Sequence, residues 1–90
     1  MQVSLQALKA FESAARRGSF KLAAEELSLT PTAISHHIGN LENRLNVSLF
    51  HRQGRRISLT GTGIRLAKAT SEGFRKIDSA LEEVVKAGNT

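Results

Sequence analysis

Apolar residues recur every three or four positions through residues 4–17, which is the spacing of one side of a helix. The residues of this stripe are Leu5, Leu8, Phe11, Ala14 and Ala15. Arg16 and Arg17 suit the negative end of a helix dipole, and Gly18 can adopt the left-handed conformation that commonly ends a helix. The pattern therefore predicts an amphipathic helix that stops at Gly18.

A second, shorter helix is predicted at about 20–27, with Ser19 as its N-cap. Its inward face comprises Phe20, Ala23, Ala24 and Leu27. Small side chains such as alanine let a neighbouring helix approach closely. Ser28 and Leu29 leave room only for a tight turn before the next helix begins.

A third helix is predicted at 31–45, with Thr30 as its N-cap and Pro31 at its first position, where proline loses no hydrogen bond. Its buried stripe comprises Ile34, Ile38, Leu41 and Leu45, which lie within about 60° of one another. The opposite side is small, polar and uncharged as far as Glu42, and it comprises Thr32, His36, Gly39 and Asn43, flanked by Ser35 and Asn40. Asn46 suits a left-handed cap at the end of this helix.

The spacing of apolar residues changes after this helix. Apolar residues at 47, 49, 57 and 59 surround a turn predicted at Gln53-Gly54, which indicates a β-hairpin. An isolated two-stranded hairpin is weak in water, so this hairpin, at about 49–59, must pack on the helices. The residues expected to make that contact are Leu49, Phe50, Ile57 and Leu59.

From Thr60, a suitable N-cap, helical spacing returns and predicts one long helix over 61–88. Its apolar seam, spaced alternately by three and four, comprises Ala67, Thr70, Phe74, Ile77, Leu81 and Val84. Such a helix is about 40 Å long, longer than the body of so small a domain. Most of the seam therefore has no partner within its own chain, and we expect it to hold two copies together.

Composition narrows the class of protein. Ninety residues suffice for one small domain, here 1–60, with the helix 61–88 appended. The chain has no cysteine and no apolar run of about 18 residues, and its N-terminus does not resemble a signal peptide, so a bacterial cytoplasmic protein is the simplest interpretation.

The net charge of +5 is unevenly distributed. Residues 1–60 contain eight Lys and Arg against four Asp and Glu, and HRQGRR at 51–56 holds much of the excess. A local basic cluster suggests a polyanionic partner, either nucleic acid or an acidic membrane surface, although a solubilising surface has the same composition.

Two short helices joined by a tight turn, followed by a basic hairpin, predict a mainly α winged helix-turn-helix, with the helix-turn-helix at about 20–39. The DNA major groove admits a helix whose outer side is not bulky, and small polar side chains can hydrogen-bond base edges. Arginines at a hairpin tip can contact phosphates or a narrow minor groove. The sequence thus favours binding of double-stranded DNA.

Other functions fit less well. His36 and His37 diverge by about 100° on a helix and lack further ligands nearby, so no metal site and no cofactor is predicted. No catalytic triad or paired carboxylate stands out, so an enzyme is not expected. A protein-interaction module that uses the 61–87 helix is the remaining alternative, although the polar side of 32–43 lacks the aromatic and aliphatic anchors of protein interfaces.

The chain resembles the N-terminal DNA-binding domain of LysR-type transcriptional regulators. The segments that support the resemblance are Phe11, GSFKLAAEEL (18–27), TPTAISHHIGNLENRL (30–45), LF-x-R-x-x-R (49–55) and LT-x-x-G (59–63). They follow in order, with the spacing of that family, over residues 3 to about 65. The remainder resembles the family's linker helix in character.

The resemblance implies that the third helix enters the major groove and that the wing lies at the minor groove or backbone. Carried over by position, the implied contacts are Pro31, Thr32, Ser35, His36 and Arg55. With the residues that flank the helix face and the hairpin tip, the predicted DNA-binding set is Pro31, Thr32, Ser35, His36, Asn40, Arg52, Arg55 and Arg56.

The resemblance also implies a homodimer through antiparallel linker helices, which presents two heads to a palindromic operator. Full-length members add a C-terminal domain that binds a small-molecule inducer and builds tetramers, and this chain is expected to be the DNA-binding portion of such a regulator, without the inducer domain. Family members often have Gln at position 31 and Arg-Gln at positions 36 and 37, where this chain has Pro31, His36 and His37. These differences concern the base sequence that is bound, not the fold.

Overall fold

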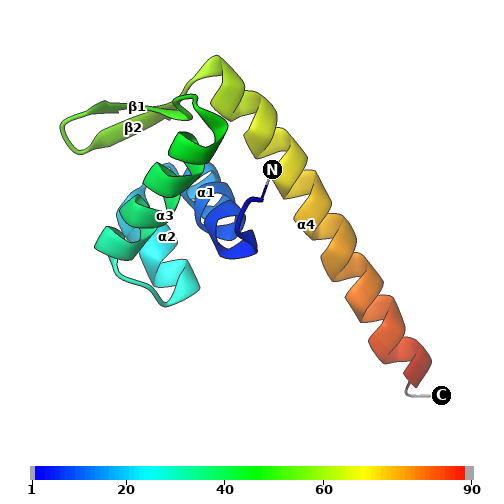
Figure 1. The fold of residues 1–90 in the computed structure, drawn as a ribbon. Coiled ribbons are helices and arrows are strands. Elements are labelled where there is room, and N and C mark those ends of the chain that lie inside the picture. The colour runs from blue at the N-terminus through cyan, green and yellow to red at the C-terminus, as the bar shows by residue number, and fades with distance from the viewer. Residues whose placement is uncertain (1, 89–90) are drawn as a thin grey trace.

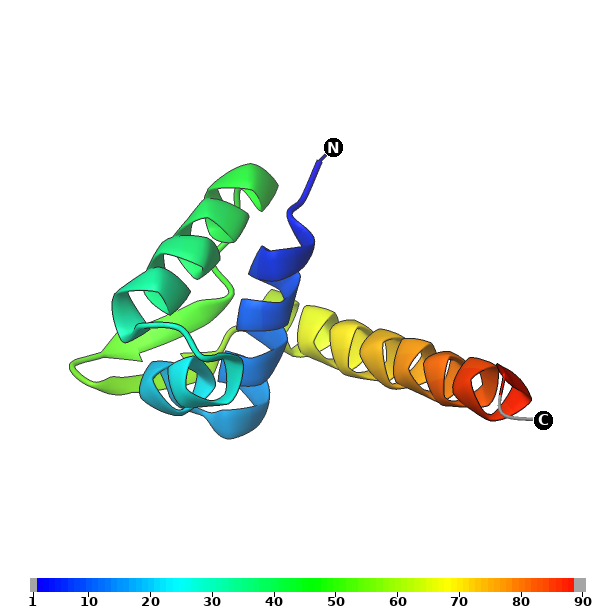
Figure 2. The same ribbon diagram turned by 90° about the horizontal axis from the view of Figure 1, so that it is seen from below.

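The computed structural model describes residues 2–88, which form four helices and one two-stranded antiparallel sheet (Figure 1). The elements in order are α1 (Leu5–Arg17), α2 (Phe20–Leu27), α3 (Pro31–Leu45), β1 (Phe50–Gln53), β2 (Arg56–Leu59) and α4 (Gly61–Gly88). Helices α1 to α3 pack together, and α4 extends away from them in both views (Figures 1 and 2). The mainly α winged architecture expected from the sequence is confirmed.

Local signals set the ends of the first three helices. The side chains of Ser4, Ser19 and Thr30 each accept a backbone N–H in the first turn of the helix that follows. Gly18 and Asn46 end α1 and α3 in the left-handed conformation, with φ of 67° and 55°. Each cap satisfies backbone groups that a helix end leaves unpaired, so these boundaries follow from the sequence.

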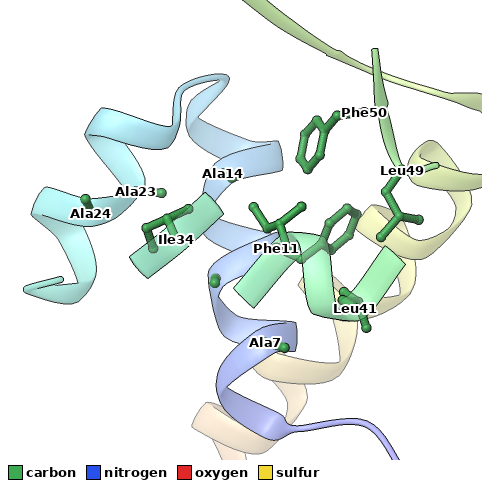
Figure 3. Close-up of a cluster of buried hydrophobic side chains, with 11 residues drawn as sticks. Ala7, Phe11, Ala14, Ala23, Ala24, Ile34, Leu41, Leu49 and Phe50 are labelled. Carbon is green, nitrogen blue, oxygen red and sulfur yellow. The ribbon is translucent and has the colours of Figure 1, made fainter. Parts of the chain in front are cut away.

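One apolar core joins the three helices to the hairpin (Figure 3). Phe11 of α1 lies at its centre, and Phe50 of β1 packs against it with ring centroids 5.5 Å apart. The buried apolar residues are Ala7, Ala10, Phe11, Ala14, Ala23, Ala24, Ile34, Ile38, Leu41, Leu49 and Phe50. Five alanines in this set let α1, α2 and α3 approach closely, so a small core excludes water with few large side chains.

The position expected for Leu5 was wrong, because its side chain is 61% exposed. The buried stripe of α1 is centred on Ala7, Ala10, Phe11 and Ala14. Leu5 lies about 200° around the helix from Ala7, which turns it away from the core. The prediction followed the large apolar residues, but at the N-terminal end of α1 the buried positions are occupied by alanines.

The hairpin differs from the expected one by a single residue. Its turn is Gly54-Arg55 rather than Gln53-Gly54, because Gln53 pairs with Arg56 in the ladder. This register also pairs Phe50 with Leu59, which places both on the core side of the sheet. Gly54 has φ of +60°, a conformation that suits glycine at the first turn position of a two-residue hairpin loop.

The start of α4 is fixed to the segment before β1. The Thr60 N–H donates to the Leu49 carbonyl oxygen at 3.0 Å, and the Thr60 hydroxyl donates to the Ser48 carbonyl oxygen at 2.7 Å. The Thr60 hydroxyl oxygen also accepts the Gly63 N–H at 3.0 Å, which confirms Thr60 as the cap. Gly63 is buried, and a Cβ there would overlap the Leu49 carbonyl oxygen. These contacts fix the direction in which α4 leaves the domain.

Candidate nucleic-acid interface

Helix α3 buries one side and exposes a small polar one. Ile34 and Ile38 are fully buried, which holds the helix firmly against α1 and α2. On the other side the predicted residues Pro31, Thr32, His36 and Asn40 are exposed, and Ser35 is half-buried. The exposed side offers hydroxyl, imidazole and amide groups without a bulky or charged side chain before Glu42, as a groove-binding helix requires.

The three wing arginines point in different directions. The strand register places Arg52 opposite Ile57, on the face of the hairpin that packs on the helices. Arg56 pairs with Gln53 on the other face, and Arg55 lies in the turn. Within residues 2–88, neither Arg55 nor Arg56 forms an ion pair. Among the three wing arginines, the positive charge without a carboxylate partner in the described chain thus lies at Arg55 and Arg56, in and next to the turn.

Arg52, by contrast, is engaged inside the protein. Its guanidinium donates to Glu42 Oε1 at 3.2 Å and lies over the Phe20 ring, 5.2 Å from the centroid. The other Glu42 oxygen accepts the Leu49 N–H at 2.8 Å. Glu42 therefore joins α3 to the start of the wing, and Arg52 extends this connection to α2. Arg52 was predicted from the sequence but Glu42 was not, because the partners of Glu42 lie seven to ten residues away.

The N-terminal end of α3 and the hairpin tip lie on the same side of the molecule, away from α4 (Figures 1 and 2). A cleft of about 380 Å³ lies between them, and Ser35, Arg52 and Arg55 from the predicted set line it. Ser19 and Lys21 at the start of α2 line it too, and neither belongs to the set predicted from the sequence. The overlooked signal was a lysine in the first turn of a helix, where the dipole disfavours a cation.

Asn40 lies apart from this cleft. It lines a separate groove with Ser4 at the start of α1 and Arg44 near the end of α3. The predicted set therefore divides into residues around the cleft, residues along the exposed side of α3, and Arg56 on the far face of the wing.

A polar cluster holds α2 against α1 and so positions the helix-turn-helix. Glu26 of α2 accepts the Ser13 hydroxyl at 2.7 Å and pairs with Arg16 and Arg17 of α1. The Arg16 hydrogen bond lowers the pKa of Glu26 to about 2, and Ser13 contributes in the same direction. The same contact, with a smaller one from Glu12, raises the pKa of Arg16.

The residues predicted for dimerisation fall into two groups along α4. Ala67 packs on the domain's own core, and the Thr70 hydroxyl donates to the Leu66 carbonyl oxygen of its own helix at 3.0 Å. Phe74 is half-buried. Beyond it, Ile77, Leu81 and Val84 are 54%, 58% and 68% exposed. Within residues 2–88, an apolar stripe without a partner thus begins past Phe74, where α4 leaves the body of the domain.

Residues 2–88 contain no group of three or more His, Cys, Asp or Glu side chains placed to hold a metal ion. Within the same range, no helix has the length and apolar character needed to span a bilayer.

The geometry defines the class of domain: two short helices around a tight turn, the second with an exposed polar side, followed by a β-hairpin, form a winged helix-turn-helix. The family model described as "bacterial regulatory helix-turn-helix protein, lysR family" matches residues 5–64. The chain therefore belongs to the lysR family, as the sequence resemblance indicated.

Individual relatives agree with this assignment. The HTH-type transcriptional regulator PerR of Escherichia coli is 49% identical over 77 residues, which cover 86% of this chain and 26% of PerR. TrpI of Pseudomonas aeruginosa, also a transcriptional regulator by name, is 44% identical over 81 residues, 90% of this chain and 28% of TrpI. The chain thus spans about a quarter of the length of these relatives.

Solved structures share the fold. The probable transcriptional regulator PA0477 from Pseudomonas aeruginosa superposes with a TM-score of 0.83 at 34% identity, over 90% of this chain and 27% of that one. The DNA-binding domain of BenM, solved with catB site 1 DNA, superposes with a TM-score of 0.88 at 23% identity over 98% of both chains.

Proposed function

We propose that this domain binds double-stranded DNA in a sequence-specific manner, with α3 in the major groove and the wing at the adjacent minor groove or backbone. The observation that supports this most directly is the joint exposure of two features on one side of the molecule. One is the small polar side of α3, and the other is the hairpin tip, where Arg55 forms no ion pair within residues 2–88. The first suits base edges and the second suits phosphates.

The chemistry of α3 and of the wing suggests a different role for each in DNA binding. Thr32, Ser35 and His36 can donate and accept hydrogen bonds, so they can distinguish one base pair from another. Arginine at the wing tip attracts every phosphate backbone alike and contributes affinity without base preference, unless it enters a narrow minor groove. The DNA-binding domain of BenM has the same fold and was solved with DNA, which supports DNA binding by this domain.

Selection of binding sites from a random duplex pool tests the proposal and yields the operator. On the selected duplex, His36→Ala should lose most of the preference over a scrambled duplex. Arg55→Ala should weaken binding to both duplexes, by at most about 1–3 kcal/mol, while Arg75→Ala on the exposed surface of α4 serves as the charge-matched control. If His36→Ala retained the full preference of the wild type, base reading by His36 would be excluded.

The operator is expected to be an imperfect palindrome, because we infer that the chain forms a homodimer through the apolar stripe of α4. Two identical heads related by a twofold axis match two half-sites of opposite orientation. A protein-interaction role for α4 is then part of the DNA-binding function and not a competing one.

The whole protein is proposed to be a transcriptional regulator that extends beyond the DNA-binding portion. This chain spans about a quarter of the length of its relatives PerR and TrpI, whose names describe transcriptional regulators. We infer that an additional domain binds a small-molecule inducer and supports a tetramer, and that the regulator acts in the bacterial cytoplasm at the nucleoid.

A further inference from the structure

Helix α3 has a glycine, Gly39, in its interior and on its exposed polar side. Because an α-helix has about 3.6 residues per turn, Gly39 lies between Ser35, one turn before it, and Asn43, one turn after it, and next to His36. After proline, glycine is the residue that most destabilises the interior of a helix. A glycine at this position therefore weakens α3 unless it serves a contact.

The contacts within residues 2–88 do not explain this glycine. Gly18 and Gly54 have positive φ, and Gly63 leaves room for a backbone carbonyl oxygen that a Cβ would overlap. The φ of Gly39 is not positive, and a Cβ added to it would meet no neighbouring element within 4 Å. The described chain thus gives no reason for a glycine at position 39, and the proposed approach of α3 to DNA supplies one.

The surface at Gly39 is shallow and apolar. In a helix interior the backbone N–H and C=O groups are hydrogen-bonded within the helix, so the Cα hydrogens of Gly39 are what it presents outward. The missing side chain leaves a dip among the side chains of Ser35, His36 and Asn43. In the major groove, the C5 methyl group of thymine is the apolar group that base edges present. The dip therefore suits this methyl group in both size and polarity.

We propose that the C5 methyl group of one thymine in each half-site fills the dip over Gly39. This glycine then selects an A·T pair at one position of the operator by shape, whereas Thr32, Ser35 and His36 act through hydrogen bonds. The inference rests on the proposed function and adds a base preference that no polar side chain provides.

The first test adds a methyl group to the protein. Gly39→Ala should raise the melting temperature, because alanine favours a helix and the added Cβ meets nothing nearby in the described chain. Its affinity for the selected operator should nevertheless fall about tenfold, since the Cβ and the thymine methyl group would occupy the same space. A lower melting temperature, or an unchanged affinity for the operator, would overturn the proposal.

The second test removes the methyl group from the DNA. Deoxyuridine keeps the hydrogen-bonding edge of thymidine and lacks its methyl group, so each thymine of a half-site is replaced by uracil in turn. Wild type should lose affinity severalfold at one position. At that position Gly39→Ala should instead gain about tenfold, because its Cβ takes the place of the missing methyl group. The preference for thymine over uracil thus reverses, and the double-mutant cycle isolates this one contact.

A matched control is Gly73→Ala, which adds the same group on α4, where nothing lies within 4 Å of the added Cβ. It should change the affinity for the thymine and uracil duplexes by the same factor as each other. Selection from the random duplex pool, repeated with Gly39→Ala, should lose the preference for thymine at the one position and keep the preferences elsewhere.

The outcomes separate this proposal from the proposed function. If uracil changes the affinity of wild type and of Gly39→Ala by the same factor at every position, no methyl group lies over Gly39, although the domain binds DNA specifically. If wild type binds selected and scrambled duplexes equally, the proposed function fails, and the assignment of Gly39 fails with it.

Discussion

At the scale of single residues, Glu26 makes the junction of α1 and α2 sensitive to acid. Its pKa is lowered to about 2 by Arg16 and Ser13, below the ordinary value of 4.5 that applies in the unfolded chain. A carboxyl with a lowered folded-state pKa contributes stability that is complete above pH 4.5 and is lost as pH falls toward 2. The helix-turn-helix should therefore loosen in acid at this contact.

Glu26→Gln should remove that contribution, which is about 1 kcal/mol at neutral pH because the ion pairs are accessible to solvent. Urea unfolding at pH 7, 4 and 3 measures it. The variant should be less stable than wild type at pH 7 and should approach it at pH 3. Glu25→Gln, an exposed neighbour without an ion pair in the described chain, is the control. A constant difference between Glu26→Gln and wild type across the three pH values would contradict the assignment.

Two glycines of α4 should respond oppositely to alanine. At Gly63 the added Cβ meets the Leu49 carbonyl oxygen, so Gly63→Ala should cost about 1–3 kcal/mol, as overpacking does. At Gly73 nothing lies within 4 Å of the added Cβ, so Gly73→Ala should stabilise the helix by about 1 kcal/mol. Thermal unfolding of both variants compares the effects directly. Equal shifts of the melting temperature would show that α4 does not dock tightly at Gly63.

At the scale of elements, one carboxylate joins the wing to α3. Glu42 accepts the Leu49 N–H and binds Arg52, and both contacts reach the first part of the hairpin. A two-stranded hairpin has little stability alone, so its position depends on such contacts and on Phe50 in the core.

Glu42→Ala should therefore loosen the wing and leave α3 in place. Backbone ¹⁵N relaxation should show lower order parameters at 50–59 and unchanged values at 31–41. Glu42→Gln should retain most of the wild-type order, because its amide oxygen still accepts the Leu49 N–H. Asn43→Ala, the exposed next residue, controls for a substitution at this end of α3. Wild-type order in the wing of Glu42→Ala would show that the apolar contacts suffice.

The elements themselves were predictable because their boundaries are local. Ser19, Thr30 and Asn46 act within one turn of the helices that they cap, so the sequence alone contains the signal. The turn register and the exposure of Leu5 were mispredicted because both depend on which residues meet across the core.

The candidate site was predictable to a similar degree. The exposed side of α3 follows from helical period, since burial of Ile34 and Ile38 determines what faces outward. The pairing of Arg52 with Glu42 and the approach of Lys21 to the wing join residues distant in sequence. Such contacts have no periodic pattern in the sequence. The number of charges alone does not distinguish Arg52, which is paired with Glu42, from Arg55 and Arg56.

At the scale of the whole molecule, the last part of α4 exposes apolar side chains that have no partner in the part of the chain that the structure describes. Ile77, Leu81 and Val84 are more than half exposed. Helix α4 extends beyond the body of the domain, and the molecule including this helix is 52 Å long. Burial of such a stripe removes apolar surface from water and favours association with a second copy.

Phe74→Asp together with Leu81→Asp should convert the proposed dimer to a monomer, because each buried charge would lack a partner at the interface. Sedimentation equilibrium measures the mass. Ser79→Asp, about 160° around the helix from Leu81, should leave the dimer intact. An unchanged mass of the double variant would show that another surface holds the copies together.

The fixed junction at Gly63 also makes α4 a lever arm. The helix has 28 residues and so is about 42 Å long, and a tilt of about 10° at its base moves its far end by about 7 Å. That displacement equals about two base-pair steps of 3.4 Å along the DNA axis. In a pair of such chains, a few degrees at one glycine therefore decide which spacing of half-sites both heads can occupy at once.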